Sequence, residues 1–455
     1  MRTDEETDIT AARVALQQAI PARVLTLGCH AGESQVEWTY DVDGRFQGPI
    51  RVEFPFALDA EDRRLLNSIG VGIAIFLAQL CLARHIELDF SATPEMITLI
   101  SPLAEMLYDV RCWKDGRSLL PPPTFGYHPG GHDLPSPSPI QEKRACLLWS
   151  GGKDSTLSAL LLRKNGYQIR PVHITANAGM EASELRAIRQ LGPELDLIYQ
   201  TLQFDFPGFL PLSDAYAVNW NRFPLCNTVP FGRDLALALL ASLVARHQEA
   251  SHLSMGHEHD CKTAYFTYQG KSVPRNDVES TRGALALETY IQRFISPGLQ
   301  LLPPLAPISE FRVLYEMLVH HSALMAQTSF CFWGTNCGQC SKCFRYALAQ
   351  RVLGCESVLA FRMNPLEGDN CPELADFLEN WRDDATLFQS QILYGLGRLV
   401  QKGDIRPGET RLEQFRDEVF PYIVSQLDAM EVALLATYSD PQVPPDFVID
   451  EAFGG

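Results

Sequence analysis

The sequence predicts an α/β protein in which a parallel-sheet domain lies between an N-terminal α+β domain and a mostly helical C-terminal region. Between residues 144 and 350, short apolar strands alternate with helical stretches. This βαβ rhythm is typical of a parallel sheet with helices on both faces. Residues 1–120 contain segments that alternate in the manner of strands, followed by one long helical pattern. Residues 351–455 are mostly helical in pattern, with scattered charges.

The N-terminal domain is expected to combine three strands with one long helix. Residues 24–27, 35–40 and 50–56 have strand-like patterns. Residues 59–85 carry apolar side chains at helical spacing, and Asp59 is the expected N-cap of that helix.

A linker is predicted at residues 121–143. Its first twenty residues read PPPTFGYHPGGHDLPSPSPI, and this density of Pro, Gly and Ser is typical of a linker that prolines stiffen in places. The alternative is a long surface loop inside one domain, which is uncommon at this length.

The central domain is expected to open with a buried strand at residues 145–149 and a helix at residues 154–165, which Gly166 ends. Apolar runs and helical patterns then alternate along the chain. Further strands are expected at residues 169–174, 197–202 and 251–255, and further helices at residues 182–191 and 234–246.

Composition and charge narrow the class of protein. Of the 455 residues, 46% are hydrophobic and 20% are charged, which is ordinary for a globular chain of two or three domains. The formal net charge of −17 repels phosphate backbones, so a nucleic-acid partner is disfavoured. The apolar runs predict no membrane span, and the acidic N-terminus does not resemble a signal peptide. Four of the twelve cysteines fall within thirteen residues, which predicts a metal site in a reducing compartment, by default the cytoplasm.

A phosphate-binding loop is predicted between the first strand and the first helix of the central domain. Its glycines let the backbone approach a phosphate, and the helix N-terminus adds N–H groups and the positive end of the helix dipole. The serine hydroxyls can donate to phosphate oxygens, the lysine can neutralise charge, and the aspartate is expected to orient Mg²⁺ or a loop amide. The residues are Ser150, Gly151, Gly152, Lys153, Asp154 and Ser155.

This SGGKDS loop lacks the Walker A spacing and resembles the signature of the PP-loop ATP pyrophosphatases. The resemblance implies a domain of the adenine-nucleotide alpha hydrolase-like (HUP) fold. It also implies an enzyme that cuts ATP between the α and β phosphates, moves AMP onto a substrate oxygen and releases pyrophosphate. The alternative is a chance Gly-Gly turn before a helix.

A zinc site is predicted late in the central domain. Four thiolates suit tetrahedral Zn²⁺ with all positions filled, so the site is expected to be structural. An iron–sulfur cluster and unliganded buried cysteines are the alternatives. The ligands, spaced C-x5-C-x2-C-x2-C, are Cys331, Cys337, Cys340 and Cys343.

Three motifs together resemble the 7-cyano-7-deazaguanine synthase (QueC-like) family. They are SGGKDS, the Pro-Phe-Gly-Arg-Asp of residues 230–234, and CGQCSKC before Phe344. The chain departs from the family because Asp234 replaces an Asn, Phe231 is an extra residue, and the first cysteine spacing is shorter. It is also much longer than the housekeeping enzyme, with added regions at both ends.

The long form resembles members found in bacterial anti-phage operons, in the Qat system and in type IV CBASS. This resemblance implies that ATP and Mg²⁺ activate 7-carboxy-7-deazaguanine as an acyl-adenylate, which an amine then attacks. In the housekeeping enzyme the amine is ammonia and the product is a nitrile. In the defence relatives the amine is expected to be the N-terminus of a partner protein, and residues 1–120 would suit recognition of that partner.

Further site residues are expected in loops that follow strands of the central domain. Arg233, at a helix N-terminus, is expected to hold the α-phosphate or developing charge as a catalytic residue beside Lys153 and Asp154. The residues His257, Glu258, His259 and Asp260 are candidates to touch substrate or Mg²⁺. The resemblance implies a substrate-reading loop that includes Asp277, Glu279 and Arg282, in which Asp277 is expected to accept from a guanine-like edge. The alternatives are a surface arginine, for Arg233, and solvated loops for the others.

Three other functions remain open from the sequence. An ATP-dependent muropeptide-precursor epimerase (acting on UDP-MurNAc-L-Ala-L-Glu) also joins an α+β domain to a PP-loop domain with late cysteines. A tRNA-thiolating enzyme would need a basic RNA face, which the acidic charge argues against. A nucleotide-binding scaffold without turnover is the non-enzymatic alternative.

Overall fold

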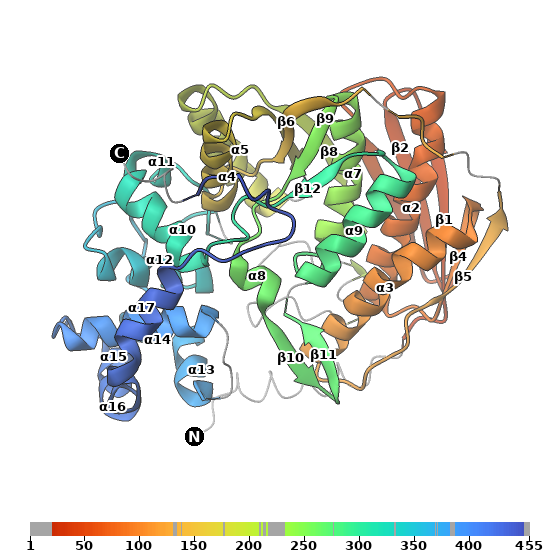
Figure 1. Ribbon diagram of the computed structural model, residues 1–455. Helices are drawn as coiled ribbons and strands as arrows, with labels where there is room; N and C mark the ends of the chain where they lie inside the picture. Colours follow the sequence, from red (N-terminus) through yellow and green to blue (C-terminus); the bar gives the residue numbers. More distant parts are fainter. Residues whose placement is uncertain are drawn as a thin grey trace.

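The computed structural model (Figure 1) has at its centre one ten-stranded sheet, and a two-stranded hairpin lies apart from it. The strand order of the large sheet is β12-β9-β6-β7-β8-β3-β2-β1-β4-β5. The structure describes residues 21–130, 134–137, 139–175, 178–208, 211–212, 215–216, 233–275, 277–331, 334–368, 370, 372–382 and 387–449.

The central part of the chain forms the parallel half of this sheet. Each neighbouring pair in the order β12-β9-β6-β7-β8 is parallel, and helices connect the strands. This confirms the predicted α/β class with a parallel PP-loop-type domain. The strands are β6 (Gln141–Leu148), β7 (Gln168–Thr175), β8 (Gln200–Asp205), β9 (Ala250–Ser254) and β12 (Gln300–Leu302).

The N-terminal strands continue the same sheet. Strand β3 pairs with β8 antiparallel, so the register Val52–Phe204 joins the two halves. Strands β3, β2 and β1 are antiparallel neighbours, whereas β1, β4 and β5 are parallel. The strands are β1 (Val24–Ala31), β2 (Gln35–Val42), β3 (Phe46–Glu53), β4 (His85–Ala92) and β5 (Thr124–Pro129).

Strand β5 lies inside the segment that composition predicts to be a linker, where it pairs with β4. The residue pattern hides this strand because prolines and glycines surround it. The division of the chain into separate domains at residues 121–143 stays a prediction.

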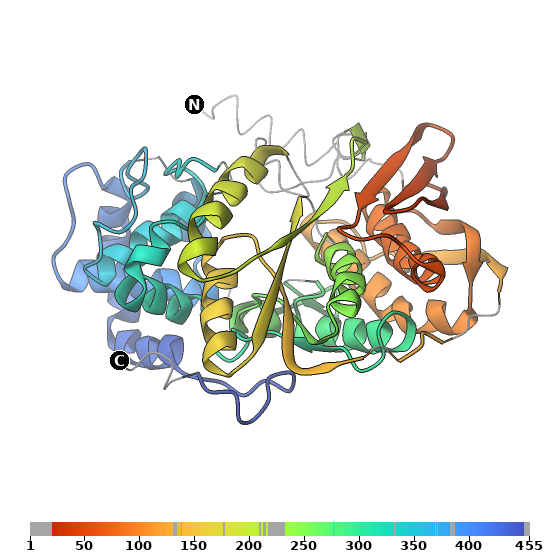
Figure 2. The same cartoon turned by 90° about the horizontal axis from the view of Figure 1, so that it is seen from above.

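Helices cover the two faces of the sheet in two groups (Figure 2). Alternate side chains of β6 face opposite cores: Cys146 packs with the N-terminal helices, and Leu147 with the C-terminal ones. The first core lies under α2 (Ala60–Cys81), α3 (Pro94–Lys114), α7 (Arg233–His247) and α9 (Thr281–Phe294). The second lies under α4 (Lys153–Lys164), α5 (Ala178–Glu194) and the C-terminal helices.

Helix α2 ties the N-terminal part to the central domain. Its predicted cap is confirmed, because Asp59 and Asp62 form a reciprocal capping box. The helix ends at Cys81, earlier than predicted, because Leu82 adopts a left-handed conformation with φ 51°. Gly72 lets α7 approach closely: a Cβ there would lie 2.0 Å from Leu239 Cδ1. By length and composition α2 could cross a membrane, but 89% of its most apolar window is buried in the protein, as expected of a core helix.

The predicted C-terminal region, residues 351–455, is helical in its described part and packs beside α4 and α5 together with the helices that precede it. These preceding helices run from α10 to α12, and η1 among them is one turn of π-helix. The elements are α10 (Glu310–Tyr315), η1 (Glu316–His320), α11 (Ser322–Met325), α12 (Ser341–Val352), α13 (Pro372–Asn380), α14 (Leu387–Gln401), α15 (Thr410–Glu418), α16 (Phe420–Ile423), η2 (Val424–Gln426) and α17 (Leu427–Leu435).

A short helix and a hairpin project from the central sheet between β9 and α9. The hairpin packs on α3, where the Trp113 and Phe266 rings stack at 4.5 Å. These elements are α8 (His259–Thr263), β10 (Tyr265–Tyr268) and β11 (Lys271–Pro274).

Candidate active site and metal centre

The candidate site lies where parallel strands β6, β9 and β12 end. In such sheets, loops at the carboxyl ends of strands form the ligand crevice. Strand β6 leads through residues 149–152 into α4, β9 leads into α8, and β12 leads through residues 303–309 into α10. The first residues of these three helices therefore meet at one edge.

The phosphate loop has the backbone that the sequence predicts. Gly151 has φ +70°, a conformation that favours glycine, and a Cβ there would lie 2.9 Å from Ala187 Cβ. Gly152 is the N-cap of α4 and makes no side-chain cap hydrogen bond. The first N–H groups of α4 have no partner within the helix, and they open next to exposed Ser150. This arrangement can hold a phosphate.

Replacing Gly151 with alanine is expected to weaken ATP binding by at least about tenfold, because a displaced loop misplaces the phosphates. Gly166 is a matched control, since it follows α4 with φ +77° and only Lys143 Cδ within reach, at 4.0 Å. Both variants should lose about 1–2 kcal/mol of unfolding free energy from the left-handed backbone. Isothermal titration with ATP should separate them. Equal ATP affinity in the two variants would contradict this role of the loop.

Lys153 does not point into solvent. Its side chain is 1% exposed and lies inside a ring of carboxylates. The ammonium contacts Asp154, lies 2.7 Å from Glu258 Oε1 and 3.6 Å from Glu310 Oε1. Burial opposes the charge, but Asp154 and Glu258 hold the pKa of Lys153 well above its usual value. Lys153 therefore holds together the starts of α4, α8 and α10.

Asp154 and Glu258 form a coupled pair of carboxyl groups beside this lysine. Burial and the Glu258 charge raise the pKa of Asp154 to about 8. Glu258 is also buried, but Lys153 and a hydrogen bond from Asp154 lower its pKa to about 2. Asp154 is the more exposed of the two, with 29% of its side chain accessible. Two adjacent carboxyl oxygens are suitable ligands for Mg²⁺, and binding would displace the shared proton.

The second part of the site centres on Glu279. Arg233 Nε lies 3.0 Å from Asp234 Oδ1, and Asp234 in turn hydrogen bonds with Glu279. Burial and the Asp234 charge raise the pKa of Glu279 well above its usual value. His257 Nε2 is 3.8 Å from Glu279 Oε1, and burial lowers the pKa of His257 to about 4.

Cys261 and Asp277 connect the second part to the first. The Cys261 thiol donates to Glu258 Oε2 at 3.2 Å and also contacts Glu279. Asp277 is buried, its charge reaches Glu279, and its Oδ1 accepts the Val278 N–H at 2.5 Å. The structure thus brings the predicted site residues of both parts into one network. Residues 230–232 of the predicted Pro-Phe-Gly-Arg-Asp element lie outside the described residues.

Sequence reasoning missed two residues of this network, Glu310 and Tyr346. Glu310 binds the Arg345 guanidinium at 2.9 Å, and the Tyr346 ring lies 5.7 Å from the Lys153 ammonium. Asp260 and Glu279 stand in the two loops that the sequence predicts to line the site, and the structure places both in the network. No loop signal pointed to Glu310 and Tyr346, because they follow in later helices.

Asp260 should make stability depend on pH. Burial raises its pKa to about 7 from 3.8, so its contribution is present below about pH 4 and lost as pH rises toward 7. In the structure the Glu310 N–H donates to Asp260 Oδ2, with the nitrogen and oxygen 2.5 Å apart. Asp260→Asn keeps an acceptor for this N–H. The variant should flatten the fall in unfolding free energy between those pH values, by up to about 1.4 kcal/mol per pH unit. Denaturant titrations across this range test it, with exposed Asp196→Asn as the control. A slope equal to wild type would contradict the assignment.

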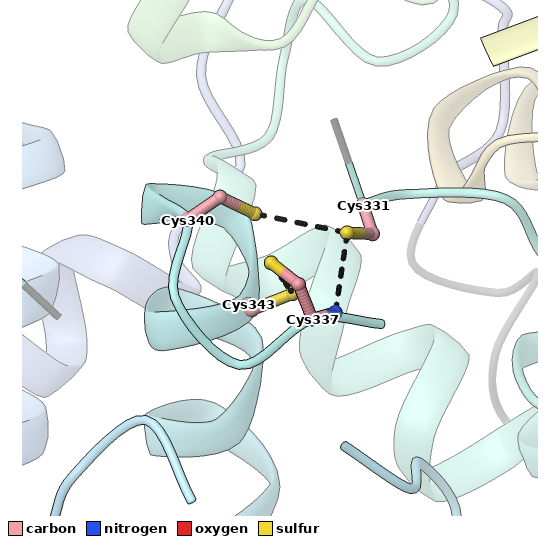
Figure 3. Close-up of side chains that lie close together, drawn as sticks. All are labelled: Cys331, Cys337, Cys340 and Cys343. Carbon is pink, nitrogen blue, oxygen red and sulfur yellow. Dashed lines mark hydrogen bonds between the residues drawn. The ribbon is translucent and has the colours of Figure 1, made fainter. Parts of the chain in front are cut away.

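The four predicted cysteine ligands converge in the structure (Figure 3). Their sulfurs lie within 4.8 Å of one another. Cys337 Sγ is 3.9 Å from Cys343 Sγ, and Cys340 Sγ is 4.0 Å from Cys331 Sγ. A tetrahedral Zn²⁺ with Zn–S of about 2.3 Å requires sulfurs about 3.8 Å apart. The cluster therefore fits zinc as the sequence predicts. Gly338, with φ +81°, makes the turn between the ligands, and a Cβ there would lie 2.0 Å from Met363 O.

The cysteine segment also supports the phosphate loop. The Ser329 N–H donates to Gly151 O at 2.9 Å, two residues before Cys331. The Ser329 and Ser183 hydroxyls are 2.9 Å apart, and Arg186 donates to Gly334 O at 3.3 Å. Helix α5 and the loop thus pack directly on the chain that a metal would order.

Comparisons with known proteins show what the chain is similar to. Residues 290–362 match a family of unknown function (DUF6395). The chain is 24% identical over 221 residues to a 7-cyano-7-deazaguanine synthase of Aliarcobacter butzleri, which covers 45% of this chain and 89% of that protein. Synthases of the same name from Nitratiruptor and Nautilia profundicola are 32% and 33% identical over 78 and 79 residues. These two matches cover 17% of this chain and 34% and 35% of the relatives. The chain is therefore a distant relative of the 7-cyano-7-deazaguanine synthases.

Proposed function

We propose that this protein is an adenylating enzyme that splits ATP into AMP and pyrophosphate to activate a carboxylate, 7-carboxy-7-deazaguanine in the first instance. The observation that carries the proposal is the start of α4. There a glycine loop with one left-handed residue presents helix N–H groups, beside the coupled Asp154–Glu258 pair.

The residues suit the stages of such a reaction. The helix N-terminus would hold ATP phosphates, and Mg²⁺ between Asp154 and Glu258 would offset the charge of the triphosphate. The α-phosphorus is then open to the substrate carboxylate oxygen, and pyrophosphate leaves. Arg233, part-exposed at the start of α7, would stabilise charge that develops on the α-phosphate.

The choice of a 7-deazaguanine as the proposed substrate rests on the name of the relatives and on the second part of the site. Asp277 is buried, and the charges of Asp277 and Asp234 both reach the Glu279 carboxyl group. A carboxylate can accept from the N1–H and amino group of a guanine-like edge.

We propose that the amine acceptor is either ammonia or the N-terminal amine of a partner protein. In the second case we propose a role in anti-phage defence. Four clustered cysteines support a reducing compartment such as the cytoplasm.

Pyrophosphate release in the presence of ATP and Mg²⁺ tests the proposal. The compounds to compare are 7-carboxy-7-deazaguanine, guanine as a control that lacks the carboxylate, and the UDP-muramoyl dipeptide of the epimerase alternative. Release with 7-carboxy-7-deazaguanine alone is expected. Pyrophosphate release only with the dipeptide would favour the epimerase over the deazaguanine enzyme. No pyrophosphate release with any of these compounds would favour a nucleotide-binding scaffold without turnover.

A further inference from the structure

The last part of the chain returns to the candidate site. We name residues 434–448 the C-terminal strap. They leave the end of α17 and run back over the central domain (Figure 1). The strap ends against α4, where the Val448 N–H donates to Asn165 Oδ1 at 2.7 Å and the Asn165 amide donates to Val448 O at 2.9 Å.

The first contact of the strap holds the start of α10. The Ser309 hydroxyl, which caps α10, donates to Leu434 O at 2.5 Å, and Arg312 Nη1 donates to Leu435 O at 3.0 Å. Thr437 then forms a β-bridge with Ile308, just before the cap. Glu310, one of the carboxylates around Lys153, is the first residue of the helix that these contacts fix.

The second contact of the strap holds α8. The Tyr438 ring stacks on His259, with centroids 3.9 Å apart and planes 9° apart. The Lys262 ammonium is fully buried and lies 3.0 Å from Asp440 Oδ2 and 2.7 Å from Gln442 Oε1. Glu258, the N-cap of α8, contacts Lys153 on the other side of the same short helix.

A five-residue helix has too few internal hydrogen bonds to fix its own position. Helix α8 is held by the His259 N–H, which donates to Ile308 O at 2.9 Å, and by the contact of Lys262 with the strap. Removing Asp440 would leave the Lys262 ammonium buried without its carboxylate, which favours a displaced α8 over an intact one.

We propose that the C-terminal strap is a positioning element of the adenylation site. Asp440, through Lys262, sets α8 and therefore the Glu258 carboxylate, and the start of the strap sets Glu310. The role in adenylation rests on the proposed function, whereas the coupling of the strap to α8 does not. Asp440 is a positioning residue, since it touches Lys262 and no candidate substrate group.

Hydrogen exchange on the full chain tests the coupling. Asp440→Asn should speed exchange of the α8 amides by about tenfold or more, while the amides of core helix α2 change little. It should also weaken MgATP binding by about tenfold. Asp440→Glu should restore both, and Asp446→Asn, at an exposed position of the same strap, should change neither.

Several results would overturn the proposal. One is an unchanged exchange rate in α8, and another is an equal loss of protection in α8 and α2, which would show a merely structural role. An ATP affinity that is unchanged in Asp440→Asn would also overturn the proposal. If that variant does not fold, Tyr438→Leu removes the stacking without leaving a buried charge, and the same regional exchange decides. A wild-type chain that releases no pyrophosphate would contradict the proposed function. The hydrogen-exchange measurements would still show whether the strap positions α8.

Discussion

Replacing Lys153 with methionine is expected to lower the free energy of unfolding by about 3–5 kcal/mol and to abolish adenylation. The methionine fills much of the same space but leaves the part-exposed Asp154 and the buried Glu258 and Glu310 carboxyl groups without their shared cation. Removing one partner of a buried ionic cluster costs far more than removing an exposed charge. Denaturant unfolding at neutral pH measures the loss.

Two comparisons make this result specific. Lys164→Met, at the exposed end of the same helix, should change the free energy of unfolding by less than about 1 kcal/mol. The deficit of Lys153→Met should also shrink as the pH falls, because carboxyl groups that have lost the cation take up protons instead. A deficit as small as that of Lys164→Met, or one independent of pH, would contradict the ring of carboxylates around Lys153.

Replacing Cys340 with serine is expected to remove bound zinc and to destabilise the chain by several kcal/mol, because a structural metal contributes its binding free energy to folding. Cys340 is fully buried, caps α12 and lies 4.0 Å from Cys331. Metal analysis by mass spectrometry and thermal unfolding with and without a chelator measure both effects. The loss should extend to ATP affinity, since Ser329 links the cysteine segment to Gly151.

Cys355→Ser is the matched control for the metal. Cys355 is a half-buried thiol whose Sγ donates to Leu353 O, outside the cluster. It should keep one zinc per chain and the wild-type unfolding midpoint. A Cys340→Ser variant that kept zinc and its midpoint would contradict the zinc site, and iron with inorganic sulfide in the wild type would make the cluster iron–sulfur.

Local signals in the sequence predicted the elements around the phosphate loop well. The strand ending at Leu148 and the helix starting at Lys153 lie within a few residues of their predicted bounds. The bounds of these two elements depend on neighbouring residues in the sequence, namely an apolar run, a glycine pair and helix-forming residues. The strand predicted at residues 197–202 instead begins at Gln200, because the Leu197 N–H donates to Gly192 O in the turn after α5.

The pairing of strands that are distant in the sequence could not be predicted from residue patterns. Nothing in Arg51–Glu53 or Gln203–Asp205 indicates that these residues pair and join two halves into one sheet. Strand β4 was missed although buried and exposed residues alternate along His85–Ala92. The surroundings of Lys153 were missed for the same reason as the strand pairing. A lysine beside glycines predicts a phosphate contact, whereas Glu258 and Glu310 reach it from distant helices.

The central claim is that a carboxylate attacks the α-phosphorus of ATP held at the start of α4. The most direct test uses 7-carboxy-7-deazaguanine labelled with oxygen-18 in its carboxylate, together with ATP, Mg²⁺ and an amine acceptor. Because the acyl-adenylate passes one carboxylate oxygen to the leaving phosphate, mass spectrometry should find the label in AMP, together with unlabelled pyrophosphate. Unlabelled AMP, or ADP with the label in inorganic phosphate, would contradict the account.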